Sequence, residues 1–170
     1  MTLVDNETVS AGDYSWIRLT LDQDNTYIID SGGGQHELTI PSSAQTGLKL
    51  NNSFTLANDG DLAYTIDFDL RKSVHLTGGG NYIMRPTLRM VKDDEAGTLT
   101  GSVDSTLIAS NCTDAVDIPA VYVFESGDPV DDMDGEDDPV ATATLPSNGP
   151  YDYSISPLEA GTYTVAFTCD

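Results

Sequence analysis

Two carboxylates stand two residues apart in the most regular strand pattern of the chain. The segment from Ala63 to Leu70 alternates polar and apolar side chains, and Asp67 and Asp69 share its polar face. At a rise of about 3.3 Å per residue, the two side chains would lie about 7 Å apart, within the range of the acid–base pairs of glycoside hydrolases. The spacing therefore permits a glycosidase-like hydrolase. The alternation favours a simpler interpretation, a half-buried strand with aspartates facing water and a core face made of Tyr64, Ile66, Phe68 and Leu70.

A second group of carboxylates is concentrated in one loop. Residues 128–138 hold seven Asp and Glu side chains in eleven positions. Close carboxylates repel one another by about 1 kcal/mol per pair in water, and Ca²⁺, a hard cation with oxygen ligands, would relieve that repulsion. An EF-hand is excluded, because with Gly135 as its sixth residue Val130 and Ala141 occupy the first and twelfth positions. Three alternatives remain: a solvated hairpin loop, a loop that docks a basic protein, and a weak calcium site formed by Asp131, Asp132, Asp134 and Asp137.

The remaining chemically active residues suggest structural roles. His36 and His75 lie far apart, each near a Gly-rich turn, and we expect both at the surface. Cys112 and Cys169 are either two buried free thiols or a disulfide. A small module buries a limited core, which makes a structural disulfide the more useful arrangement. No nucleophile elbow or phosphate-binding loop occurs in the sequence, so we expect no enzyme and no cofactor other than weakly bound Ca²⁺.

Charge is distributed very unevenly along the chain. All 7 Lys and Arg residues lie at or before Lys92, whereas the 28 Asp and Glu residues extend to the C-terminus and give a formal net charge of −21. Residues 93–170 hold 17 of the acidic side chains and no basic one. Such a surface repels nucleic acid and anionic membranes, so we exclude nucleic-acid binding. No apolar run approaches the roughly 18 residues that span a bilayer, so we expect no membrane span.

Short extended segments separated by turn residues run along the whole chain. Regular spacing of this kind predicts an all-β fold of two β-sandwich modules. The polar segment from Lys92 to Gly97, where the charge balance changes, divides the chain into modules 1–92 and 97–170. In the second module we expect strands at Thr98 to Val103, Ala120 to Glu125, Val140 to Leu145, Tyr151 to Ile155 and Thr162 to Thr168.

The second module resembles a known domain family. Gly101-Ser102-Val103, Pro119 to Val123, Gly149 to Tyr151 and Leu158 to Val165 follow one another in order. This series resembles the carboxypeptidase regulatory-like domain, a transthyretin-like (prealbumin) Greek-key sandwich, over about residues 97–170. The most specific part is the closing Leu-x-x-Gly-x-Tyr-x-Val. The resemblance implies a non-catalytic spacer or binding unit of secreted and surface proteins.

The first module resembles the bacterial domain-of-unknown-function 4382 family over about residues 3–91. The segments that carry this resemblance are Ala11 to Leu19, Gly47 to Leu50, Asp67 to Ser73 and Tyr82 to Pro86. The family occurs on envelope lipoproteins and secreted proteins, often before a regulatory-like domain. Its usual opening strands before the Ala-Gly-Asp-Tyr segment are missing here, so we expect a module that is incomplete at its N-terminus.

Together these features predict a non-catalytic protein of the bacterial cell envelope or exterior. We expect a periplasmic or extracellular location, with a lipid anchor in the full-length precursor. The function would be binding, adhesion or spacing, with a carbohydrate or a protein as the surface ligand. Exposed Tyr rings could serve such recognition, although most of the Tyr side chains in the second module should be half-buried; these are Tyr122, Tyr151, Tyr153 and Tyr163. We expect a monomer, or a dimer formed through an open sheet edge.

Overall fold

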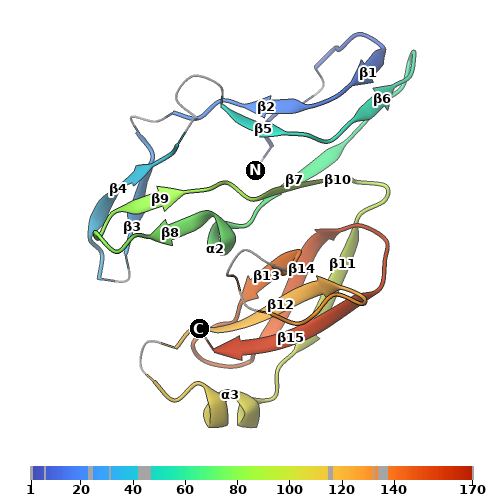
Figure 1. The fold of residues 1–170 in the computed structure, drawn as a ribbon. Coiled ribbons are helices and arrows are strands. Elements are labelled where there is room, and N and C mark those ends of the chain that lie inside the picture. The colour runs from blue at the N-terminus through green and yellow to red at the C-terminus, as the bar shows by residue number, and fades with distance from the viewer. Residues whose placement is uncertain are drawn as a thin grey trace. The chain divides into compact units, whose positions relative to one another are not determined.

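The computed structural model describes residues 2–5, 7–22, 25–30, 32–41, 47–114, 117–131, 133 and 138–169. Within these residues short β-strands predominate, and the two α-helices are only 4 and 7 residues long (Figure 1). The all-β class expected from the sequence is therefore confirmed. The chain forms two compact units: residues 1–64 with 75–85, and residues 65–74 with 86–170. The second unit thus includes residues on both sides of Lys92.

The first unit consists of short, mainly antiparallel strands. Two strand pairs open it: β1 (Gly12–Tyr14) with β6 (Phe54–Leu56), and β2 (Ile17–Leu19) with β5 (Leu48–Leu50). A four-stranded sheet follows in the order β3-β4-β9-β8. Its strands are β3 (Tyr27–Ile29), β4 (Gln35–Thr39), β9 (Tyr82–Met84) and β8 (Val74–Leu76), with β4 and β9 parallel.

The second unit begins with the pair β7 (Tyr64–Phe68) and β10 (Leu88–Lys92), with helix α2 (Leu70–Ser73) directly after β7. Its larger part contains the pair β11 (Gly97–Ser102) and β14 (Asp152–Leu158), and a three-stranded sheet. In that sheet β12 (Pro119–Glu125) lies between β13 (Ala141–Thr144) and β15 (Tyr163–Cys169). Each of these five strands overlaps a segment that the sequence predicts to be extended.

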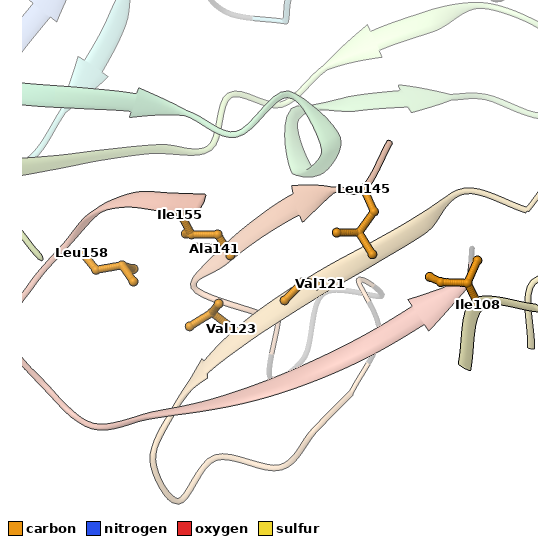
Figure 2. Close-up of a cluster of buried hydrophobic side chains, with 7 residues drawn as sticks. All are labelled: Ile108, Val121, Val123, Ala141, Leu145, Ile155 and Leu158. Atoms are coloured by element: carbon orange, nitrogen blue, oxygen red, sulfur yellow. The ribbon is translucent and has the colours of Figure 1, made fainter. Parts of the chain in front are cut away.

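The core of the second unit is organised around β12. This strand is central and its residues Ala120 to Phe124 are all buried, so both faces of the strand are covered. A central strand covered on both sides needs a continuous apolar run, which explains why this segment does not alternate. Figure 2 shows the cluster on one face, formed by Ile108, Val121, Val123, Ala141, Leu145, Ile155 and Leu158. The opposite face of β12 contributes Ala120, Tyr122 and Phe124 to a second cluster.

Helix α3 (Ser105–Asn111) is an element that the sequence analysis did not predict. Asp104 caps it by accepting a hydrogen bond from Thr106 N at 2.7 Å. The helix contributes one buried side chain, Ile108, to the core, so it carries no amphipathic repeat that a periodicity argument could find. The helix ends at Asn111, and its C-cap residue Cys112 forms a disulfide with Cys169 at the end of β15. Of the two alternatives for the cysteines, the structure therefore has the disulfide.

The expectation of one strand from Ala63 to Leu70 is wrong at its C-terminal end. Strand β7 stops at Phe68, and Leu70 starts α2 with 60% of its surface exposed instead of joining the core face. Asp69 causes the change, because its side chain accepts a hydrogen bond from Lys72 N and caps the helix.

Candidate functional site

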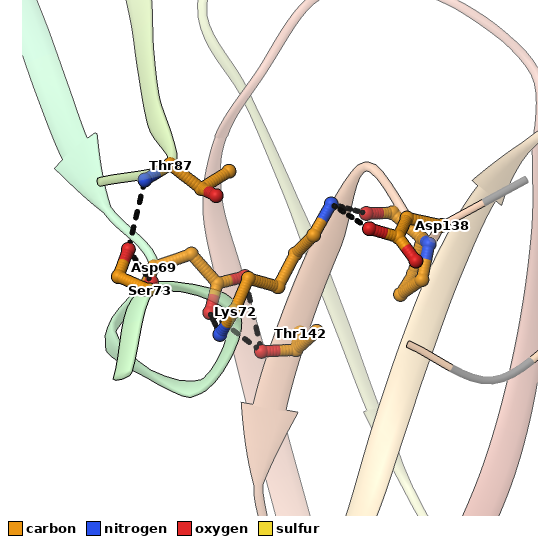
Figure 3. Close-up of polar contacts among 7 residues, drawn as sticks. Asp69, Lys72, Ser73, Thr87, Asp138 and Thr142 are labelled. Atoms are coloured by element: carbon orange, nitrogen blue, oxygen red, sulfur yellow. Dashed lines mark hydrogen bonds and ion pairs between the residues drawn. The ribbon is translucent and has the colours of Figure 1, made fainter. Parts of the chain in front are cut away.

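A buried polar cluster surrounds α2 and includes one of the two candidate catalytic carboxylates (Figure 3). Asp69 is only 8% exposed. Its carboxylate accepts a hydrogen bond from Lys72 N at 3.1 Å, and both carboxylate oxygens lie 3.1 Å from the hydroxyl of Thr142 on β13. The side chain therefore caps the helix and links it to the three-stranded sheet of the same unit.

The backbone around Asp69 is held by a second set of bonds. Asp69 N donates to Thr87 O at 3.1 Å, and the fully buried Ser73 donates its hydroxyl proton to Asp69 O at 2.5 Å. The Ser73 hydroxyl also accepts a hydrogen bond from Thr87 N at 2.8 Å. Because this hydroxyl is engaged as donor and as acceptor, Ser73 acts as a structural link and not as a free nucleophile.

The basic residues of α2 contact other parts of the second unit. Lys72 Nζ donates to Pro139 O at 2.7 Å and lies 3.8 Å from Asp138 Oδ2. The Arg71 guanidinium lies 5.7 Å from the centroid of the Tyr122 ring, and its Nε lies 3.4 Å from the Tyr122 hydroxyl. These contacts join a four-residue helix to β12 and to the segment before β13, and their arrangement is that of a structural anchor.

The second candidate carboxylate has a partner of its own. Asp67 Oδ2 accepts a hydrogen bond from Arg89 on the paired strand β10 at 2.5 Å, and the Asp67 side chain is 30% exposed. The prediction that both aspartates face water is thus wrong for Asp69. The assumption of an unbroken strand produced the error. A signal against it was present, since an Asp followed by Leu-Arg-Lys is typical of a helix N-terminus.

The Gly-rich turn before β4 fixes another carboxylate. Asp30 accepts hydrogen bonds from His36 Nε2 at 2.6 Å, from Gly34 N at 2.7 Å and from Gly32 N at 2.9 Å. The hydrogen bond with His36, followed by that from Gly34, lowers the pKa of Asp30 below its ordinary value of 3.8. His36 packs against the Tyr82 ring and is half-buried, whereas His75 is exposed as expected. The arrangement closes the β3–β4 hairpin.

The proposed calcium ligands fall largely outside the described residues. Asp132, Asp134 and Asp137 are not described, and Asp131 is exposed. In the described part of the chain no three His, Cys, Asp or Glu side chains come together in a way that would hold a metal ion. Calcium binding by the acidic loop therefore stays a prediction.

The tyrosines named as candidate recognition residues are mostly part of the framework. Tyr122 is buried, whereas Tyr151, Tyr153 and Tyr163 are half-buried. Tyr163 OH donates to Glu159 O at 2.7 Å, across the Gly161 turn, beside a shallow hollow that Glu125 also lines. Burial, with a smaller contribution from Glu159 and Glu125, raises the pKa of Tyr163 above 10.0.

The first unit contains a similar tyrosine hydrogen bond at a similar short sequence. Ala11-Gly12-Asp13-Tyr14 matches Ala160-Gly161-Thr162-Tyr163, and Tyr14 OH donates to Ser10 O at 2.6 Å. In both units a tyrosine hydroxyl thus donates to a carbonyl four residues upstream, but Tyr163 is the first residue of β15 whereas Tyr14 is the last residue of β1.

These features define an all-β protein of short strands, in which the polar clusters stabilise turns and one disulfide closes the second unit. The chain belongs to the family described as domain of unknown function DUF4382, whose model matches residues 1–86. No curated protein and no solved structure matches the chain. In the described residues, no helix has both the length and the apolar character that a membrane-spanning helix needs.

Proposed function

We propose that the chain is a non-catalytic β-protein of the cell envelope or exterior, acting as a binding, adhesion or spacer module. The observation that carries this proposal is the role of the candidate acid–base pair. Asp69 is used as a helix cap and as the acceptor for Thr142, and Asp67 is used as the partner of Arg89. Groups held in this way stabilise local structure, and a glycosidase pair would instead direct two carboxyl groups at one substrate.

The second part of the proposal concerns residues 97–170, which we infer to be a carboxypeptidase regulatory-like, transthyretin-like sandwich. Two local features support it. Gly101 lies opposite Tyr153 in the β11–β14 pair, and a Cβ on Gly101 would overlap the Tyr153 ring. The closing motif places Tyr163 over the Gly161 turn. These two contacts explain why glycine and tyrosine occur at these positions of the regulatory-like sequence pattern.

The cysteines and the charge support the proposed periplasmic or extracellular location. Disulfides persist in oxidising compartments, so the Cys112–Cys169 bond supports a periplasmic or extracellular protein. A net charge of −21 keeps such a module soluble and disfavours close self-association. We therefore expect a monomer in light scattering at moderate salt. A stable dimer would instead favour pairing through an open sheet edge.

The function is tested by two measurements, the hydrolysis of glycosides and the binding of the protein to an array of ligands. The wild-type protein and an Asp67→Asn/Asp69→Asn variant are assayed on a panel of chromogenic glycosides. The same two proteins are then applied to an array of neutral and acidic oligosaccharides and of peptides. We expect no turnover by either protein, and retention on the array by the wild type. Hydrolysis that the double variant abolishes while circular dichroism shows it folded would overturn the proposal.

A further inference from the structure

The single tryptophan of the chain lies at the surface of the first unit. Trp16, directly before β2, is 44% exposed. Its ring is approached by two cations: Arg18 Cζ lies 4.8 Å from the ring centroid and Lys49 Nζ lies 5.3 Å from it. Tryptophan is enriched at recognition surfaces, because its ring combines a large apolar area with a polar N–H group.

The strand register brings the two cations together. Arg18 on β2 is paired with Lys49 on β5, so like charges lie directly opposite each other, which destabilises an antiparallel pair. Gly47, directly before β5, allows the backbone there to lie close to β2. Its φ is +66°, and a Cβ there would stand 2.6 Å from Leu19 O and 3.1 Å from Arg18 Cγ. The chain thus accepts a repulsive pair at an exposed aromatic ring.

These two cations differ from the basic residues of the second unit. Lys72, Arg89 and Lys92 each pair with an Asp or Glu, and Arg71 lies against Tyr122. Among the described residues, no carboxylate forms an ion pair with Arg18 or Lys49, and both side chains are exposed. In a protein of net charge −21, Trp16, Arg18 and Lys49 therefore form a local positive and aromatic surface, named here the Trp16 patch.

We propose that the Trp16 patch binds an acidic polysaccharide whose sugar rings carry carboxylates, such as a polyuronate. The chemistry of the patch selects this class. One uronate ring offers an apolar C–H face to an indole and, at its edge, a carboxylate to a guanidinium and an ammonium group. An acidic peptide offers the carboxylate on a flexible stem without a flat apolar face beside it. This inference rests on the proposed binding function and names its ligand class.

The first test measures the local charge at Trp16. Because the chain has one tryptophan, its fluorescence reports on the patch alone. Iodide and caesium quenching are compared at constant ionic strength, each relative to free N-acetyltryptophanamide. We expect iodide to quench more effectively than caesium despite the net negative charge. This preference for iodide over caesium should fall in the Arg18→Gln/Lys49→Gln variant. It should persist in the control variant Arg85→Gln/Lys92→Gln, which removes the same amount of positive charge at other positions. Stronger quenching by caesium in the wild type would overturn the proposal.

The second test titrates polygalacturonate into the whole protein and follows Trp16 emission. We expect binding that weakens with salt, because exposed charges are screened within about 8 Å at physiological ionic strength. The Arg18→Gln/Lys49→Gln variant should bind about tenfold or more weakly. The Arg85→Gln/Lys92→Gln control should bind as the wild type does, and uncharged dextran should give no response. Circular dichroism checks that both variants are folded.

The other outcomes separate this proposal from the general function. Equal binding of polygalacturonate by the wild type and the Arg18→Gln/Lys49→Gln variant would overturn the Trp16 patch as the binding site. It would still support the proposal that the protein is a binding module. Tighter binding of polyglutamate than of polygalacturonate would overturn the ligand class in favour of an acidic polypeptide. A wild-type protein that binds neither polymer would overturn the Trp16 patch as an anion site, whereas the array experiment would still decide the binding function.

Discussion

Replacing Asp69 by Ala tests whether this carboxylate is a structural anchor. The substitution removes the cap of α2 and the acceptor for the Thr142 hydroxyl. Loss of an N-cap costs about 1 kcal/mol, and loss of a hydrogen bond to a charged group costs about 1.5 kcal/mol or more. We therefore expect the free energy of unfolding of the second unit to fall by about 2–3 kcal/mol. Asp69→Asn keeps one acceptor oxygen and should lose less.

The assay is urea denaturation followed by far-ultraviolet circular dichroism. Trp16 fluorescence, recorded in parallel, follows the first unit, which contains the only tryptophan. The matched control is Asp128→Ala, which removes one negative charge from an exposed position. A stability within about 0.5 kcal/mol of the wild type for Asp69→Ala would refute the reasoning, because surface substitutions alone cause changes of that size.

Three further predictions follow from the same structure. Replacing Cys112 and Cys169 by Ser opens a loop with a sequence separation of 57 residues, and thermal unfolding should show a loss of about 4 kcal/mol in the second unit on the chain-entropy model; an unchanged transition would contradict it. Tyr163→Phe should cost about 1 kcal/mol of unfolding free energy through the lost bond to Glu159 O. Because the folded-state pKa of Tyr163 is raised, the stabilisation that the protonated hydroxyl gives the folded state is fully present below pH 10.0 and is lost as the pH rises through the folded pKa. The Phe variant should therefore lose less stability than the wild type at alkaline pH. Parallel pH profiles of the two proteins would argue against this. Finally, NaCl should raise the melting temperature, since a net charge of −21 destabilises the compact state through self-repulsion; a melting temperature independent of salt would exclude this repulsion as a significant effect.

Much of the second unit could be predicted from the sequence because its cues are local. The apolar run at Ala120 to Phe124 and the turn at Gly161 place strands that the structure also contains. Helix α3 was missed because only Ile108 on it is buried, so neighbouring side chains carry no pattern. The spacing argument for Asp67 and Asp69 assumed a strand that continues past Phe68, whereas β7 ends there and Asp69 caps α2.

Composition and the local order of residues are enough to indicate the all-β class, the acidic charge and the presence of one tryptophan. These properties depend on composition and on the order of neighbours. The tertiary structure, in contrast, sets which partners the polar side chains use. It set Asp69 against Thr142, 73 residues away, and Arg18 opposite Lys49. Such pairings depend on sheet register and on turns far apart in the chain, and no local periodicity encodes them.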